Sequence, residues 1–292
     1  NMDIEILNFL SKFTPEELKK IAERAGLDPR KVAPEIDLSN YKYQIVKNKL
    51  DSLAANDLSS IQCQSKHFFI EKIRKNIKNI CILGLIQSGK TNEIINLVYF
   101  CIRYLKIPVI IIIQNKTSGY KQLDYRIMNF IEQLEDYDFK VRYTKGIKNN
   151  TIENIFNYDN PLPEVIISLS NYKQLGRLES KLKCMKDSNN ERLTPYALFM
   201  DEYDELIKSR SDIEELEGLS ISQKKELEKN RKKIEEYSNF IKDNSFINVG
   251  VTATLLAVMM TDNLLVNDIF CLKPSDNYVG FGSDRINLID IE

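Results

Sequence analysis

The chain has 292 residues, of which 43% are hydrophobic and 28% charged, and its formal net charge is −1. This size allows one substantial core plus a small appendage, and the near-neutral charge excludes a protein that coats nucleic acid through a general excess of basic residues. Five widely spaced cysteines and a single histidine provide no C-x-x-C pair and no zinc ligand set, which predicts a reduced, intracellular and zinc-free protein. The longest aliphatic run, Val109 to Ile113, is too short to cross a bilayer, so we expect no membrane contact.

The first sixty residues have the pattern of a small all-helical unit, which we expect to form an N-terminal accessory domain over residues 1–60. A capping box from Thr14 to Glu17 is followed by apolar residues at helical spacing until Gly26. Such a bundle suits docking to a protein partner or to nucleic acid, and it suits equally well a passive cap on the main domain.

From residue 61 onward, helical patterns alternate with apolar strands, which predicts an α/β fold over residues 61–292, with a parallel sheet flanked by helices. The strands that we expect are Ile80 to Leu83, Val109 to Ile113, Lys140 to Tyr143, Val165 to Ser168, Ala197 to Met200 and Ile247 to Val251. The helices that we expect between them are Lys90 to Leu105, Gly119 to Leu134 and Tyr172 to Leu182. Because ligands bind at the carboxyl edge of open parallel sheets, we expect the functional site at that edge.

The first of these strands runs directly into the sequence G-L-I-Q-S-G-K-T, which is the G-x-x-x-x-G-K-T pattern of a phosphate-binding P-loop. In such a loop, backbone N–H groups and the start of the following helix point at a polyphosphate anion. Gly84 and Gly89 permit the turn, Lys90 neutralises the β and γ phosphates as part of catalysis, and the Thr91 hydroxyl suits Mg²⁺. The sequence therefore predicts a site for a nucleoside triphosphate.

The stretch from about residue 205 to 245 is strongly charged, with Glu-Glu, Lys-Lys and Arg-Lys-Lys runs and no strand pattern. This composition predicts one or two solvent-facing helices inserted into the sheet domain. Leu227, Ile234 and Ile241 recur every seven residues, but so short a repeat falls below the several heptads of a coiled coil. We expect a helix that packs on its own domain through one face.

Two further strand ends carry residues suited to nucleotide chemistry. Asp201 and Glu202 follow the strand that begins at residue 197; Asp201 is placed to hold Mg²⁺, and Glu202 is placed to orient the attacking water and accept its proton. The last predicted strand ends in Thr252-Ala-Thr254, whose hydroxyls can bond the acidic pair or sense the γ phosphate and so couple hydrolysis to movement. Adjacent polar residues also occur at strand ends as simple solvated termini, and it is their combination with a P-loop that favours the catalytic interpretation.

The order P-loop, D-E-x-D, T-A-T resembles that of superfamily 2 helicases and translocases, whose first RecA-like lobe carries these three motifs. The resemblance covers residues from about 61 to 270. Two segments are also similar to the Z-one domain proteins, helicase/endonuclease relatives from viruses and bacterial defence loci: V-G-V-T-A-T-L-L-A at 249–257 and P-S-D-N-Y-V-G at 274–280. The resemblance implies nucleotide contacts from Gln87 and Ser88 in addition to the loop residues above, and an adenine contact from Gln62 or Gln64.

The resemblance also implies contacts to single-stranded DNA or RNA where two other strands end. The residues expected to make them are Gln114, Asn115, Lys116, Ser170 and Asn171. Polar side chains and backbone amides at these places would hold sugar-phosphate without reading sequence. The following helix carries a basic face that could extend this surface or could be an ordinary solvated face. Its residues are Lys173, Arg177, Lys181 and Lys183.

The chain therefore resembles the N-terminal portion of an ATP-dependent helicase or translocase in the cytoplasm, the nucleus or nucleoid, or a viral factory. Hydrolysis in that superfamily uses arginines from a second RecA-like lobe, and the 38 residues after Thr254 are too few for one, so we expect weak ATP hydrolysis by this chain alone. An alternative is a nucleotide-switched signalling or scaffold ATPase that recruits a protein partner through the N-terminal unit. A small-molecule or nucleoside kinase also has a P-loop, but lacks the paired acid and hydroxyl strand ends.

Overall fold

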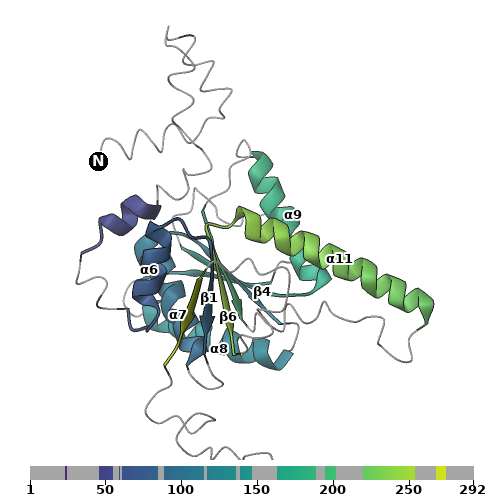
Figure 1. Cartoon of the computed structure of the whole chain (residues 1–292), viewed down its shortest axis with the longest axis horizontal. Helices are drawn as coiled ribbons and strands as arrows, with labels where there is room; N and C mark the ends of the chain where they lie inside the picture. The colour runs from purple at the N-terminus through teal and green to yellow at the C-terminus, as the bar shows by residue number, and fades with distance from the viewer. Residues whose placement is uncertain are drawn as a thin grey trace, which may run out of the picture.

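A parallel β-sheet with helices on both faces forms the centre of the computed structural model (Figure 1). The structure describes residues 24, 46–54, 59, 61–84, 89–114, 117–135, 139–146, 163–188, 195–201, 220–253 and 268–273. Within these residues the strands are β1 (Asn79–Leu83), β2 (Val109–Ile113), β3 (Arg142–Lys145), β4 (Glu164–Leu169), β5 (Ala197–Asp201), β6 (Ile247–Thr252) and β7 (Asp268–Cys271). The helices are α6 (Lys66–Arg74), α7 (Lys90–Phe100), the π-helix η1 (Cys101–Leu105), α8 (Thr117–Glu135), α9 (Tyr172–Ser188) and α11 (Ile221–Asn244).

The described strands lie in the order β3-β4-β2-β5-β6-β1-β7, and every neighbouring pair is parallel. The prediction of an α/β fold with a helix-flanked parallel sheet is confirmed. All of the predicted strands are present with ends displaced by two residues or less, and the helix predicted from Lys90 to Leu105 is present with a π-helical last turn. Because the strands run the same way, their carboxyl ends lie at one edge of the sheet.

Alternating side chains of the strands fill two separate cores, one on each face of the sheet. In β2, Ile111 packs in the core that α6, α7 and α8 cover, whereas Ile110 and Ile112 pack in the core that α9 covers. Successive side chains of a strand point to opposite faces, so an uninterrupted aliphatic run suits a strand that is covered on both sides. All residues of β2 are accordingly buried.

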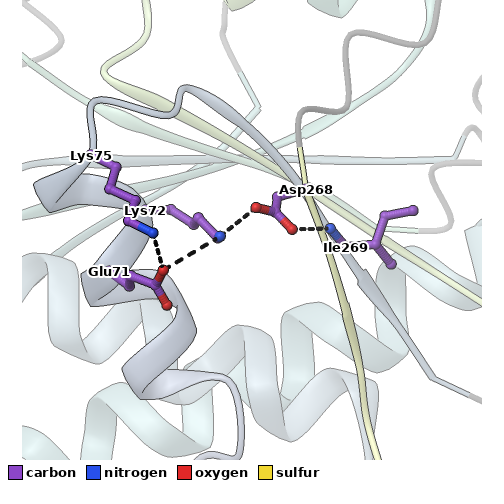
Figure 2. Close-up of polar contacts among 5 residues, drawn as sticks. All are labelled: Glu71, Lys72, Lys75, Asp268 and Ile269. Carbon is purple, nitrogen blue, oxygen red and sulfur yellow. Dashed lines mark hydrogen bonds and ion pairs between the residues drawn. The ribbon is translucent and has the colours of Figure 1, made fainter.

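The edge strand β7, which the sequence analysis does not predict, pairs with β1 on the side opposite β6. Its anchors come from α6, where the Lys72 ammonium forms an ion pair with Asp268 and lies 3.9 Å from a Glu71 carboxylate oxygen (Figure 2). The rings of Phe68 and Phe270 also lie 5.3 Å apart, centre to centre. Lys72 and Asp268 are 196 residues apart in the chain, so a local pattern carries little sign of this strand.

The charged stretch that predicts an inserted helix contains α11, which packs on α9 through one face. Ser220 begins the helix with a capping box: its hydroxyl accepts a hydrogen bond from the Gln223 N–H (3.3 Å), and the Gln223 amide oxygen accepts one from the Ser220 N–H (2.9 Å). Ile241 is fully buried, whereas Leu227 is 40% exposed. The C-terminal half of α11 is therefore packed on the domain, and its other end extends away from the sheet (Figure 1).

Most of the predicted N-terminal helical unit lies outside the described residues. Residues 46–51 are helical, and Val46 and Leu50 are buried in the same core as Ile61, Phe69 and Ile73. This short helix therefore packs with the sheet domain. The rest of the N-terminal unit stays a prediction.

Candidate functional site

Three strand ends that carry predicted site residues lie next to one another at the carboxyl edge of the sheet. The last residue of β1, Leu83, pairs in register with Thr252 of β6, and Asp201 of β5 pairs with Val251. The Gly84 N–H donates a hydrogen bond to the Thr252 carbonyl (3.0 Å), which extends the ladder by one residue beyond Leu83. The structure thus brings Gly84, Asp201 and Thr252 together on adjacent strands, as the sequence predicts.

Described residues on either side of the segment 85–88 contact one another at the start of α7. Gly89 immediately precedes the helix with a φ of +87°, a left-handed conformation that costs a residue with a Cβ roughly 1–2 kcal/mol. The Gly89 carbonyl accepts a hydrogen bond from the Glu93 N–H (3.1 Å). The Lys90 ammonium reaches back across the loop and donates to the Gly84 carbonyl (3.0 Å). The first and last parts of the predicted P-loop are therefore held close together.

A buried carboxylate that the sequence analysis missed fixes the position of α7. Glu93 is 5% exposed and accepts hydrogen bonds from the Gln64 N–H (2.8 Å), the Ser65 N–H (3.1 Å) and the Ser65 hydroxyl (2.6 Å). The start of α7 is thereby joined to the start of α6. Burial, together with this carboxylate, raises the pKa of the Cys63 thiol to about 12, so this thiol stays protonated at neutral pH. The only sequence signal for Glu93 is its place on the apolar face of α7, four residues before the buried Leu97.

The acid and hydroxyl positions differ in their access to solvent. Asp201 is half-buried at the end of β5, so a ligand at the sheet edge can reach it. Thr252 is fully buried, and its strand lies between β1 and β5. A coupling role for Thr252 would therefore act from inside the sheet, between the end of β1 and the acid. Other residues predicted for this site lie outside the described residues: Gln87, Ser88, Glu202 and Thr254.

The residues predicted to contact a nucleic-acid strand occupy the same edge farther along the sheet. Gln114 directly follows β2, and the Ser170 N–H donates a hydrogen bond to the Ile113 carbonyl at the end of that strand (2.8 Å). The side-chain oxygen of Asn171 accepts a hydrogen bond from the Gln174 N–H (3.0 Å), so this residue caps the first turn of α9. The structure brings these three predicted residues to one edge, whereas their predicted neighbours lie outside the described residues: Asn115 and Lys116.

Of the two glutamines that the resemblance suggests for adenine, Gln64 has a structural partner. Its amide exchanges two hydrogen bonds with the backbone of Lys273, one in each direction and each 2.9 Å long. This pair ties the start of α6 to the segment that follows β7. An adenine contact from Gln64 would require the pair to open, whereas Gln62 is exposed.

The oxygen ligands available at the carboxyl edge suit a hard cation that is shared with a phosphate. Among the described residues there is no group of three or more His, Cys, Asp and Glu side chains that could hold a metal ion. A Mg²⁺ ion that is held by one or two protein oxygens together with phosphate oxygens needs no such group. The Thr91 hydroxyl and the Asp201 carboxylate are both on partly buried residues and would be enough.

Neither a family model nor a curated protein matches the chain. In the part of the chain that the structure describes, every helix is too short or too polar to cross a membrane. The function is therefore inferred from the residues at the carboxyl edge.

Proposed function

We propose that the chain is the nucleotide-binding lobe of an ATP-dependent nucleic-acid motor, a helicase or translocase that binds and hydrolyses ATP with Mg²⁺. The observation that supports this most strongly is the meeting of Gly84, Asp201 and Thr252 on three adjacent strand ends. A phosphate-binding loop and a carboxylate at one sheet edge can hold the two parts of a Mg²⁺–triphosphate, its phosphates and its metal.

The segment from Gly84 to Thr91 supplies the groups that a polyphosphate needs. The first N–H groups of a helix lack partners within the helix, and the helix dipole favours an anion beside them. Gly89 turns the chain into α7 through a conformation that side chains disfavour. The Lys90 ammonium, now 3.0 Å from the Gly84 carbonyl, would exchange this neutral acceptor for a phosphate oxygen, and hydrogen bonds between charged groups are the stronger kind.

The metal would be held by Thr91 and Asp201, which come from the first turn of α7 and the end of β5. When bound there, Mg²⁺ neutralises charge on the phosphates. Glu202, the next residue after Asp201, would orient a water molecule and accept its proton. Thr252 lies between the P-loop strand and the acid strand, so a shift of either strand would reach the other through it.

The nucleic-acid part of the proposal is supported by the continuation of the same edge past the nucleotide site. The ends of β2 and β4 carry Gln114, Ser170 and Asn171, and they follow β5 in the strand order. A nucleic-acid strand lying along this edge would contact residues close to Asp201, so the nucleotide and the strand could affect each other over a short distance. A nucleotide-switched scaffold would share the nucleotide site but would need no strand contact.

Calorimetric titration of Mg²⁺-ATP into wild-type protein and Lys90→Ala tests the nucleotide site. A hydrogen bond to a charged group contributes about 1.5–3 kcal/mol, so the variant should bind roughly 10- to 150-fold more weakly. Lys140→Ala is the matched control, because this lysine is exposed and precedes β3 at the opposite edge of the sheet. Equal affinities of all three proteins would refute the P-loop assignment, whereas nucleotide binding without binding of single-stranded DNA or RNA would favour the scaffold ATPase.

A further inference from the structure

The basic residues of α11 are concentrated in its N-terminal half. From Lys224 to Lys233 the helix carries six basic and two acidic residues, a net charge of +4, in a chain whose formal net charge is −1. The residues from Ile234 to Asn244 carry one basic and three acidic residues, a net charge of −2. The positive charge therefore lies on the half of the helix that precedes its packing on the sheet domain.

This arrangement of charge is unfavourable for the helix itself. The first turn of α11 contains no acidic residue, and basic side chains near a helix N-terminus oppose the helix dipole. The dipole acts mainly on the first turn, and farther along Lys232 forms an i,i+4 ion pair with Glu228 (3.5 Å), so the stability of α11 gives no reason for a net charge of +4 in this half. A polyanion beside this half of the helix would be attracted by the same side chains.

The basic half of α11 ends at Lys233, near the carboxyl end of β4. The Lys233 ammonium donates a hydrogen bond to the hydroxyl of Tyr172, the first residue of α9, which starts three residues after the end of β4. From Lys233 the helix continues to Asn244 and leads into the amino end of β6. The residues before Lys233 form about 18 Å of helix at 1.5 Å per residue, and this part of α11 extends away from the sheet past α9 (Figure 1).

Two tyrosines form a partly exposed aromatic pair where α11 crosses α9. The rings of Tyr172 and Tyr237 lie 5.8 Å apart, centre to centre, with an angle of 38° between their planes. Gly176 of α9 leaves room for this arrangement, since a Cβ at that position would lie 3.0 Å from the Tyr237 ring. The Lys233 ammonium is 5.5 Å from the centre of the Tyr172 ring, and its hydrogen bond lowers the pKa of that tyrosine. Aromatic rings flanked by lysines are typical of surfaces on which nucleic-acid bases stack.

Other interpretations of this surface are less well supported. A partner helix would need a continuous apolar seam, but the large apolar side chains exposed on this half of α11 are Ile221 and Leu227, six residues apart. On α9 itself, Lys183 forms an ion pair with the buried Glu179, which reduces its availability to an anion. The basic half of α11 also carries the denser positive charge, a net +4 over ten residues against a net +3 over the 17 residues of α9, so it is better placed than α9 to attract a polyanion.

We propose that the basic half of α11, together with Tyr172 and Tyr237, binds a single-stranded nucleic acid that lies along the carboxyl edge. This inference rests on the proposed function as a nucleic-acid motor and makes the inserted helix part of its strand-binding surface. The lysines contact phosphates without reading sequence, and the Tyr172 ring stacks on a base.

Fluorescence anisotropy with labelled single strands of DNA and RNA of about 20 nucleotides tests this proposal. The variant Lys225→Glu with Lys229→Glu reverses two exposed charges, and it should bind at least about tenfold more weakly at about 50 mM salt. The slope of log K against log salt should also become shallower, by about 0.7 for each lost phosphate contact. The matched control reverses two exposed lysines that precede β2 and β3 at the opposite edge, Lys106→Glu with Lys140→Glu, and should change affinity less than about twofold.

The tyrosine is tested by a pair of variants that differ in the ring. Tyr172→Ala should weaken binding by about tenfold, whereas Tyr172→Phe, which keeps the ring, should stay within about threefold of the wild type. Unchanged binding by the α11 charge variant, in a protein whose wild type binds both Mg²⁺-ATP and a strand, would overturn this inference and leave the proposed function intact. Failure of the wild type to bind single-stranded DNA or RNA would overturn both this inference and the proposed function. Binding to vesicles rich in phosphatidylserine, without binding to either strand, would show that the basic half attracts a membrane surface and would overturn both in the same way.

Discussion

The contacts of Glu93 predict a large effect of this residue on stability. Glu93→Ala removes the carboxylate that accepts three hydrogen bonds, which come from the Gln64 N–H, the Ser65 N–H and the Ser65 hydroxyl. Each buried donor left unsatisfied costs about 1–3 kcal/mol, and water that enters the vacated space offsets part of the sum, so we expect a loss of roughly 3–5 kcal/mol. This is a substantial fraction of the approximately 5–15 kcal/mol by which proteins are stable.

A double-mutant cycle shows whether this loss comes from the contacts in the structure. Ser65→Ala alone removes one donor and should cost about 1 kcal/mol. In the Glu93→Ala background the serine hydroxyl has lost this acceptor, so removing it should cost nothing or restore some stability, giving a coupling energy of at least about 1 kcal/mol. Urea unfolding followed by circular dichroism measures all four proteins, with Glu132→Ala on the exposed face of α8 as a control that should change stability by less than about 0.5 kcal/mol. Effects that simply add, or a loss below about 1 kcal/mol for Glu93→Ala, would refute the reasoning.

The left-handed conformation of Gly89 predicts that Gly89→Ala destabilises the fold by about 1–2 kcal/mol and weakens Mg²⁺-ATP binding, whereas Gly89→Asn should cost less stability. Thermal unfolding and calorimetry compare the two variants, and equal effects would contradict the left-handed conformation of this residue. Burial raises the pKa of Glu164 from its usual 4.5 to about 7, so the folded protein holds a proton that the unfolded chain releases, and stability should fall by about 3 kcal/mol as pH rises between these values. Glu164→Gln should remove this fall when urea unfolding is compared at about pH 5 and about pH 8; a pH dependence identical to that of the wild type would show that this carboxyl is not the group responsible. Lys72→Met keeps a buried aliphatic chain but loses the ion pair with the partly exposed Asp268, so the free energy of unfolding should fall by no more than about 1 kcal/mol. This difference from the wild type should shrink in about 1 M salt, and a difference that does not depend on salt would argue against the ion pair as its source.

Most of the sheet could be predicted from the sequence because its central strands are buried on both faces. The aliphatic run of β2 and the alternation of strands with amphipathic helices are local properties, and they determine both the fold class and the parallel arrangement. β7 could not be predicted in the same way. It is short, lies at an edge, and is held by Lys72 and Phe68, which are remote in sequence.

The candidate site shows the same division between local and remote information. The P-loop pattern is local, and the rule that parallel strands end at one edge is enough to bring Asp201 and Thr252 near it. The contacts of Glu93 with residues 28 and 29 positions away, and of Gln64 with Lys273 at a separation of 209, depend on how helices and loops pack. A charged residue on an apolar helix face reveals that a partner exists but does not identify it.

The most direct test of the central claim, that Lys90 and Asp201 act on the same nucleotide, is a titration of a fluorescent ATP analogue in excess Mg²⁺ and in EDTA. We predict that wild-type protein binds more tightly with Mg²⁺, and that Asp201→Asn keeps the affinity measured in EDTA but loses most of the gain from the metal. Lys90→Ala should bind weakly in both conditions, because it loses a phosphate contact. An Asp201→Asn variant whose affinity rises with Mg²⁺ as much as that of the wild type would contradict the account, since this carboxylate would then lie away from the bound nucleotide.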